Sequence, residues 1–162
     1  MKNMPDLSLK QTKNGNDVFA NKNFKRGEQI IEFHGKFVAY EQLPRPYNEV
    51  KDHYVQIGKN LYMGPSGNID DFFNHSCNPN SGLKITGKKA VLAAIRDIKK
   101  GEEITWDYST TMDEDDWTME CNCGSQNCRK KIMDFKYLPK NVQQRYIKLG
   151  IVPDYILENL EY

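Results

Sequence analysis

Apolar residues in the first two-thirds of the chain form short runs separated by turns that contain glycine. The runs are too short for amphipathic helices and rich in β-branched and aromatic residues, which favours strands. The turn Gly87-Lys88-Lys89 between two such runs indicates a hairpin. We therefore expect strands at 17–20, 29–33, 54–57, 83–86 and 90–98.

The apolar pattern changes to a helical period near the end of the chain. Apolar residues recur at helical spacing at Val142, Tyr146 and Leu149, and Gly150 suits the C-terminus of this helix. Pro153 suits the first turn of a second helix over 154–160. The sequence thus predicts a mainly β body followed by short C-terminal helices.

Length, charge and hydropathy exclude several classes of protein. The chain has 162 residues, a length typical of one domain with a short appendage. Its 23 basic and 22 acidic side chains leave a net charge of +1, which argues against nucleic-acid binding over the whole surface. The longest apolar run, 90–95, is far shorter than the roughly 20 residues of a membrane helix. Because the first residues also lack the apolar core of a secretory signal, we expect a soluble intracellular protein.

The four cysteines are the first indication of a specific site. Cys121, Cys123 and Cys128 form a C-x-C-x4-C cluster, and Cys77 is the only other cysteine in the sequence. In an intracellular protein, grouped cysteines are more typical of metal ligands than of disulfides. A structural zinc takes four ligands, commonly all thiolates, so one zinc site would use every cysteine. The alternative is four unlinked thiols in loops or in the core.

The segment 72–80, FFNHSCNPN, concentrates amide, imidazole, hydroxyl and thiol side chains. Such density is typical of a loop that holds an irregular shape for a ligand. A hydrolase that uses Cys77 with His75 is disfavoured, because residues two apart rarely meet as nucleophile and base. His75 by itself indicates little, since a single histidine is more often structural than a ligand.

The segment 101–108, GEEITWDY, predicts a turn followed by a strand that ends in aromatic residues. Alone, it would be an ordinary edge strand. Charge is uneven further along, because 113–116 is acidic and 129–148 is rich in Lys and Arg. We interpret the basic stretch as solvated surface. A zinc-ribbon nucleic-acid binder is disfavoured, since the cysteines lack a second contiguous pair.

In chain order, these segments resemble the SET-domain protein lysine methyltransferases with a zinc-binding post-SET segment. Residues 14–20, NGNDVFA, are similar to the family's N-terminal cofactor loop. Gly67-Asn68 followed by NHSCNPN at 74–80 is similar to its signature loop. Residues 101–108 match its catalytic strand, and C-x-C-x4-C-R at 121–129 matches its post-SET segment.

The resemblance implies S-adenosylmethionine as the cofactor and a SET fold of several small sheets with a pseudoknot. Tyr108 would be the catalytic tyrosine, and Trp106 would limit how many methyl groups fit. The implied zinc ligands are Cys77, Cys121, Cys123 and Cys128. The implied cofactor-binding residues are Gly15, Asn16, Asp17, Val18, Asn74, His75 and Tyr108.

The chemistry of the implied reaction agrees with the aromatic content of these segments. Methyl transfer needs a neutral amine, yet lysine has a pKa of about 10.4 and is about 0.1% neutral near pH 7. A narrow aromatic channel disfavours the ammonium form by desolvation and holds the amine in line with the methyl carbon. Candidate channel walls are Phe33, Tyr54, Phe72 and Trp106, although Phe33 and Phe72 suit the core equally well.

Four residues depart from the family pattern. Asp17 replaces the second glycine of the cofactor loop, where it either keeps the turn or weakens cofactor binding. Asp71 stands where an arginine is common, and Lys130 replaces a common glycine after the last cysteine. Trp106 has no hydroxyl to hold a water near the amine, which favours transfer of more than one methyl group.

We therefore expect a SET domain at 5–110, a post-SET zinc segment at 111–135 and a helical extension at 136–162. The expected function is lysine methylation of a protein or peptide, with histones as candidate substrates and without direct contact to nucleic acid or membrane. The acidic run 113–116 would attract such a basic peptide. The alternative is an inactive SET module that binds basic peptides, with Asp17 and Asp71 as signs of lost cofactor binding.

Overall fold

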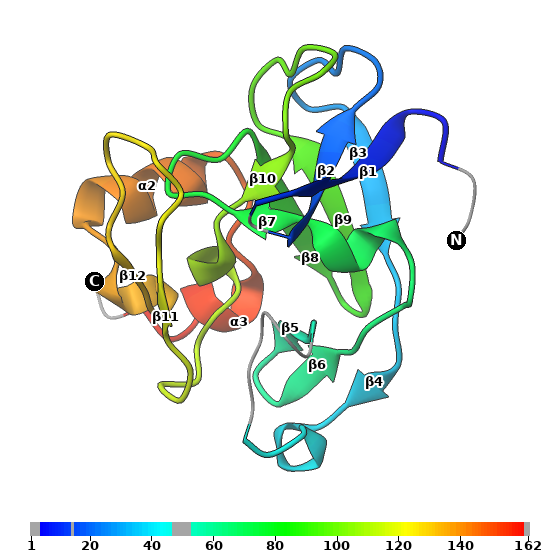
Figure 1. The fold of residues 1–162 in the computed structure, drawn as a ribbon. Helices are drawn as coiled ribbons and strands as arrows, with labels where there is room; N and C mark the ends of the chain where they lie inside the picture. Colours follow the sequence, from blue (N-terminus) through cyan, green and yellow to red (C-terminus); the bar gives the residue numbers. More distant parts are fainter. Residues whose placement is uncertain (1–3, 14, 47–52, 161–162) are drawn as a thin grey trace.

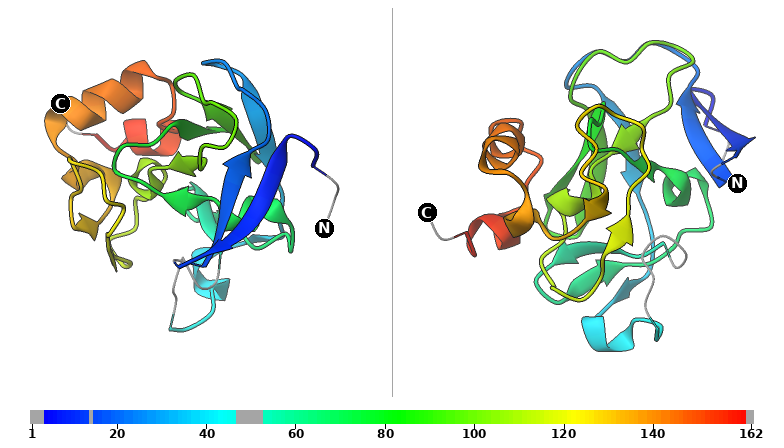
Figure 2. Two further views of the ribbon diagram at one scale, coloured as in Figure 1. Left: turned by 45° about the horizontal axis from the view of Figure 1, so that its top comes forward. Right: turned by 60° about the vertical axis from the view of Figure 1, so that its left-hand side comes forward.

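Figure 1 shows the computed structural model, in which residues 4–13, 15–46 and 53–160 are described. Within these ranges the chain forms five small β-sheets and two short helices near its end. The helices lie on the side of the molecule opposite the N-terminal hairpin, as both Figure 1 and Figure 2 show. The prediction of a mainly β body with a helical tail is confirmed.

The central sheet has the strand order β3-β9-β8 and is entirely antiparallel. Its strands are β3 (Gln29–Phe33), β8 (Ser81–Thr86) and β9 (Lys89–Ala94). The hairpin predicted at Gly87 is confirmed, and the φ of 59° at this residue is one that glycine adopts without strain. The strand predicted at 90–98 ends earlier, at Ala94, and Ile98 instead forms an isolated bridge with Phe24.

An N-terminal hairpin pairs β1 (Leu7–Thr12) with β2 (Gly15–Ala20). The sequence predicted part of β2 but not β1. Only Leu7 of β1 is buried, so this strand lacks the alternation of apolar and polar residues by which an isolated strand is found. Its pairing with β2 comes from the hairpin register rather than from its own composition.

A second antiparallel sheet lies at the lower edge of Figure 1, with the order β4-β6-β5. It contains β4 (Phe37–Val38), β5 (Val55–Gly58) and β6 (Leu61–Met63). The strand predicted at 54–57 is therefore present, shifted by one residue. The 3-10 turn η1 (Tyr40–Gln42) lies between β4 and β5, and η2 (Ile69–Phe72) follows β6 along the chain.

The two segments with the most distinctive sequence meet in a parallel pair of very short strands. β7 (Asn74–His75) pairs with β10 (Thr105–Trp106), so that Asn74 lies opposite Thr105 and His75 opposite Trp106. The backbone N–H of Ile104 donates to the carbonyl of Val18 at 2.8 Å. These bonds bring β2, β7 and β10 together, although they are far apart in sequence. The pseudoknot implied by the resemblance concerns chain threading and stays a prediction.

The cysteine region has a small hairpin of its own, β11 (Met119–Glu120) with β12 (Lys131–Ile132). Two 3-10 turns flank it, η3 (Tyr108–Thr110) before and η4 (Phe135–Tyr137) after. The buried side chains of this region form a cluster separate from the main core.

The C-terminal helices are α2 (Lys140–Lys148) and α3 (Asp154–Leu157). Gly150 ends α2 as predicted, with φ 65° and paired backbone bonds from Gly150 to Ile147 and from Ile151 to Tyr146. α3 is shorter than the predicted 154–160, because the chain tightens after Leu157 into bonds three residues apart. Neither helix has the length or apolar content that crossing a bilayer would require among the described residues.

The helical tail packs directly on the central sheet. A Cβ added to Gly82 of β8 would lie 2.6 Å from Cγ2 of Ile151, so only glycine allows this approach. The tail has its own buried cluster around Tyr146 and Ile156. Ile95 belongs to this cluster and Cys77 to that of the cysteine region, so the division of the chain near residues 110 and 135 stays a prediction.

Candidate active site

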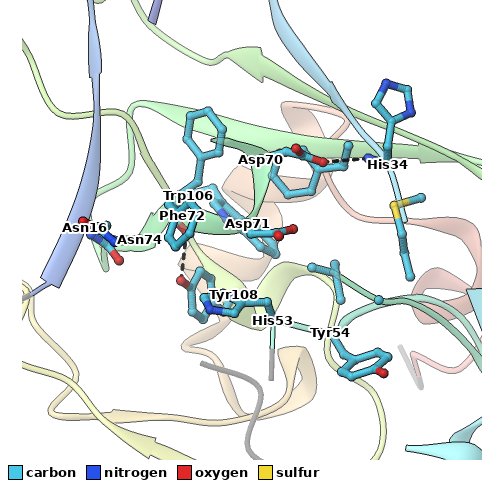
Figure 3. Close-up of a pocket in the computed structure, with 15 residues that line it drawn as sticks. Asn16, His34, His53, Tyr54, Asp70, Asp71, Phe72, Asn74, Trp106 and Tyr108 are labelled. Carbon is cyan, nitrogen blue, oxygen red and sulfur yellow. Dashed lines mark hydrogen bonds between the residues drawn. The ribbon is translucent and has the colours of Figure 1, made fainter. Parts of the chain in front are cut away.

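A cavity of about 260 Å³ opens between the second sheet and the β7–β10 pair. Tyr54, Phe72, Trp106 and Tyr108, which the sequence assigned to the channel and the catalytic position, all line it (Figure 3). Phe33, the remaining candidate wall, also lines the cavity. The lining also contains Asn16 and Asn74, which the resemblance assigned to the cofactor. The sequence did not point to His34, His53, Met63, Asp70 or Phe73.

The deep wall of the cavity is a group of packed aromatic rings. Trp106 is 2% exposed, and its ring lies edge-on to Phe33 at 6.3 Å between centroids and tilted against Tyr108 at 4.8 Å. Phe33 in turn stacks on Phe73 at 5.7 Å. Phe33 thus belongs to the core and to the cavity wall at once. Such rings offer a cationic or neutral amine an apolar surface with favourable π-faces.

Tyr54 reaches the cavity because two glycines leave room for it. A Cβ on Gly64 would lie 2.8 Å from Cε1 of the Tyr54 ring, and a Cβ on Gly35 would lie 1.9 Å from the carbonyl oxygen of Gly64. Side chains at these positions would therefore push β6 away from the chain after β3 or displace the tyrosine. No local pattern in the sequence indicates this requirement, because both glycines look like ordinary turn residues.

The Tyr108 side chain is fixed at the inner end of the cavity. Its hydroxyl donates to the carbonyl of Phe73 at 2.9 Å, and its backbone N–H donates to Nδ1 of His75 at 3.2 Å. Figure 3 shows the ring below Trp106 and Phe72, facing the cavity. One oriented hydroxyl therefore stands beside the aromatic wall.

His75 is neutral in this setting. Burial lowers the pKa of its imidazole to about 4, even though Asp107 acts in the opposite direction. Because Nδ1 accepts from the Tyr108 backbone, the proton is on Nε2, which lies 3.4 Å from Sγ of Cys77. The 3.4 Å approach of Nδ1 to Asp107 is therefore not an ion pair. His75 therefore links the backbone of Tyr108 to the cysteine cluster.

Asn74 stands between the cavity and a second hollow of about 540 Å³. Tyr108 also lines both, so the two spaces meet at these side chains. The far wall of the second hollow comes from the cysteine region, at 119–123. A ligand in the second hollow would therefore contact the same two side chains that border the cavity.

The predicted cofactor loop contributes to this junction unevenly. Asn16 lines the cavity, at the same end as Asn74 in Figure 3. Asp17 is 3% exposed and accepts a 2.6 Å hydrogen bond from Nδ2 of Asn74. The side chain of Val18 lies in the core, and the backbone carbonyl of Val18 accepts a hydrogen bond from the N–H of Ile104. Gly15, with φ 116°, lines neither hollow and begins β2, where it is paired with Thr12.

The four cysteines come together although Cys77 is more than 40 positions from the others in sequence. Their sulfur atoms all lie within 4.8 Å of one another, and those of Cys77 and Cys121 are 3.7 Å apart. Tetrahedral zinc with Zn–S bonds of about 2.3 Å places sulfurs about 3.8 Å apart, whereas a disulfide needs about 2.05 Å. Burial raises the pKa of the Cys77 thiol to about 11, so an ion is needed to hold it as a thiolate. The residues fit a four-cysteine zinc site.

A buried polar network that the sequence did not reveal joins three parts of the chain. The carboxylate of Asp107 is fully buried, and Arg129 donates to its Oδ1 at 2.7 Å. Tyr146 of α2 donates to Oδ2 at 2.9 Å. Asp107 lies between Trp106 and Tyr108, while Arg129 follows the last cysteine. The network therefore connects the aromatic wall to the cysteine region and to the helical tail.

The structure shows how three of the four departures from the family pattern, Asp17, Asp71 and Lys130, fit the local backbone. Asp17 lies in extended backbone of β2, so no strained turn is involved. Asp71 accepts from the backbone N–H groups of Ser66 and Gly67, at 2.9 and 2.7 Å, and so closes its own turn. Lys130 has φ 64°, in the left-handed region that glycine favours, and the backbone follows the path that a glycine would take.

The acidic run 113–116 is engaged within the molecule. Asp115 pairs with Lys136, and Asp116 pairs with Arg45 at 2.9 Å. None of the four residues lines the cavity that contains Tyr108. Attraction of a basic peptide by this run stays a prediction. Lys136 and Arg45 already compensate part of the negative charge of the run. The remaining contacts are Asp113 with Asn159 and Glu114 with Tyr62.

Comparison with known proteins gives a consistent picture. Residues 15–109 match the family model described as SET domain. The chain is 37% identical over 140 residues to the variant-silencing SET domain-containing protein of Plasmodium falciparum. This alignment covers 76% of the chain and 5% of the Plasmodium protein. It is 32% identical over 139 residues to the histone-lysine N-methyltransferase ASHH3 of Arabidopsis thaliana. This alignment covers 78% of the chain and 38% of ASHH3.

Among solved structures, the chain resembles KRYPTONITE in complex with mCHG DNA and SAH. The TM-score is 0.63 at 24% identity, over 78% of this chain and 29% of that one. A second KRYPTONITE structure, which also contains an H3(1-15) peptide, gives a TM-score of 0.61 at 22% identity. At this identity the likeness concerns the fold, and it confirms the fold expected from the sequence. The chain spans far less than two-thirds of the length of these relatives.

Proposed function

Because the chain belongs to the SET domain family, we propose that it is a protein-lysine N-methyltransferase that uses S-adenosylmethionine. The observation that carries this proposal is the junction of two spaces at Asn74 and Tyr108. One space is a narrow aromatic cavity suited to a lysine side chain. The other is an open hollow, bounded by the cysteine region, that is large enough for part of a nucleoside.

In this proposal, S-adenosylmethionine occupies the second hollow and supplies an electrophilic methyl group. The residues of this hollow that would hold it are Asn74 and His75, with Asn16 beside Asn74 on the cavity side and the zinc-clamped cysteine region as the outer wall. The aromatic cavity would desolvate the lysine, which favours the neutral amine, and would align it toward the junction. The oriented hydroxyl of Tyr108 would stand at the point where the amine and the methyl group meet.

The proposed substrate is a lysine in a basic protein segment such as a histone tail. Two observations support it: the relatives named as histone-lysine methyltransferases, and the neighbouring KRYPTONITE structure that contains an H3 peptide. That KRYPTONITE structure also contains DNA, whereas we predict no direct contact of this chain with nucleic acid. The four cysteines are free of disulfides and suit a reducing compartment, so we propose that the protein acts inside the cell.

The inactive peptide-binding module is the second candidate, because Asp17 and Asp71 differ from the family pattern. Both carboxylates have well-formed hydrogen bonds, so neither distorts the backbone. Titration calorimetry with S-adenosylmethionine separates the candidates. An inactive module would bind a basic peptide without binding the cofactor.

The first prediction tests the role of Tyr108. Tyr108→Phe is expected to lower kcat by about 10²-fold or more, since it removes one oriented hydroxyl from the reacting centre. Cofactor affinity should stay within about twofold, because the ring and its packing remain. Methyl transfer to histone peptides and calorimetry measure the two quantities. The matched control is Tyr137→Phe, at an exposed tyrosine away from the cavity. An unchanged kcat in Tyr108→Phe would remove this residue from its proposed role.

A second prediction concerns the number of methyl groups. Trp106 presents no hydroxyl to a water beside the amine, so the wild-type chain is expected to give di- or trimethylated product. Trp106→Tyr should shift the product toward monomethyl-lysine, because a phenol hydroxyl can hold a water where a further methyl group would go. Mass spectrometry of the peptide product distinguishes these outcomes. A wild-type product that stays monomethylated at high enzyme concentration would contradict the prediction.

A further inference from the structure

Two carboxylates converge on the amide of Asn74, at the junction of the two hollows. Oδ1 of Asp17 lies 2.6 Å from Nδ2 of Asn74, and Oε1 of Glu103 lies 3.2 Å from the same nitrogen. Ionised carboxylates only accept hydrogen bonds, so the amide must turn its NH2 group toward them. The amide oxygen of Asn74 therefore points the other way, and within the described residues no hydrogen bond reaches it.

This arrangement is held rigidly by the backbone. The second oxygen of Asp17 accepts from the hydroxyl of Thr12 at 2.7 Å, which fixes the carboxylate at both ends. Glu103 forms a backbone bridge with Phe19 of β2, and Asn74 is paired with Thr105. The three side chains thus come from three segments that are bonded to one another, and little reorganisation is needed when a ligand binds.

The two carboxylates have no cationic partner among the residues that the structure describes. Asp17 is buried, and burial together with the nearby Asp17 charge raises the pKa of Glu103. A pair of partly buried acids without a counter-ion costs free energy, which a bound cation would recover. By contrast, Glu102 lines the same hollow but is already paired with Arg96 at 2.9 Å.

The methyl donor and its by-product differ by one positive charge. S-adenosylmethionine has a sulfonium and an ammonium group, and methyl transfer converts the sulfonium into a neutral thioether. Negative charge at the junction therefore stabilises bound S-adenosylmethionine more than it stabilises bound S-adenosylhomocysteine. Asp17 belongs to this chain rather than to the usual family pattern, which has glycine there.

We propose that Asp17, with Glu103, is a positioning residue that makes the cofactor hollow select the charged methyl donor over the neutral by-product. It would do so by orienting the Asn74 amide, so that its oxygen is available to accept from the cofactor's ammonium, and by adding negative charge behind the wall of the hollow that would hold the donor. The consequence is weak inhibition by S-adenosylhomocysteine. This inference rests on the proposed function.

The test is calorimetric titration of the full chain with each ligand, for wild type and for Asp17→Asn. The variant keeps the size of the side chain and removes its charge, and its amide oxygen can still accept from Asn74 while its NH2 group faces the hydroxyl of Thr12. Affinity for S-adenosylmethionine should fall about five- to tenfold, while affinity for S-adenosylhomocysteine should change less than about twofold. The matched control is Glu102→Gln, which removes a compensated and more exposed charge from the same hollow. Its ratio of the two affinities should stay within about twofold of wild type.

The possible outcomes separate the two proposals. Equal losses for both ligands in Asp17→Asn, or no loss for either, would overturn the selectivity and leave the proposed function standing. A wild-type chain that binds neither ligand would overturn the proposed function, and the selectivity with it. Thermal unfolding of each variant establishes that an altered ratio comes from a folded protein.

Discussion

Arg129→Met is expected to lower the free energy of unfolding by about 3–5 kcal/mol, because it leaves the carboxylate of Asp107 buried without a counter-charge. The guanidinium of Arg129 lies 2.7 Å from that carboxylate, whose side chain is fully buried. Methionine fills a similar volume, so the loss would arise from the charge rather than from a cavity. Urea denaturation in the presence of zinc measures the change.

Three further variants show whether the buried charge is the cause. Lys131→Met, at an exposed position of β12, should change stability by less than about 0.5 kcal/mol. Tyr146→Phe should cost about 1 kcal/mol, because it removes one hydroxyl that donates to Asp107. The double variant Asp107→Asn with Arg129→Met should be more stable than Arg129→Met alone, since the uncompensated charge is gone. A double variant that is less stable than Arg129→Met would contradict this account.

Removal of zinc is expected to produce the second large effect. Zinc present at about a thousand times its Kd stabilises a folded chain by about 4 kcal/mol, which for this size corresponds to about 8–16 °C in Tm. Chelation should lower Tm by this amount and should also weaken binding of S-adenosylmethionine, because 119–123 form one wall of the second hollow. Differential scanning calorimetry and cofactor titration, each with and without chelator, measure the two effects.

The stoichiometry of the metal provides an independent check. Native mass spectrometry should show one zinc per chain, and Cys77→Ser should reduce zinc retention although Cys77 lies outside the C-x-C-x4-C cluster. Ser76→Ala is the matched control, because it alters the neighbouring residue of the same loop without removing a thiolate. Full zinc retention in Cys77→Ser would show that Cys77 is not a ligand, despite its 3.7 Å distance from Cys121.

Elements that are determined by residues adjacent in sequence could be predicted from the sequence. The hairpin around Gly87 and the end of α2 at Gly150 are examples, since each requires a left-handed glycine at one position. β1 could not be predicted in this way, because its stability comes from β2. The same is true of β7 and β10, each two residues long, whose strand conformation exists only in their mutual pairing.

The candidate site shows the same division. The motifs identified Asn74, Tyr108 and the four cysteines, and the resemblance to a family supplied the expectation that they meet. The contact of Asp17 with Asn74 and the contact of Arg129 with Asp107 could not be predicted. In each contact the two residues are far apart in sequence, and no local pattern indicates that they meet. A sequence also does not show whether a charged side chain is buried or on the surface.

The network around Asp107 also determines how much of the chain can be separated from the rest. The segment that matches the SET domain family ends at residue 109, before both Arg129 and Tyr146. A fragment cut there would keep the buried acid but lose both groups that satisfy it. The smallest self-sufficient unit must therefore include α2 as far as Tyr146. Transplanting this domain into another protein would require the helical tail to be transferred with it.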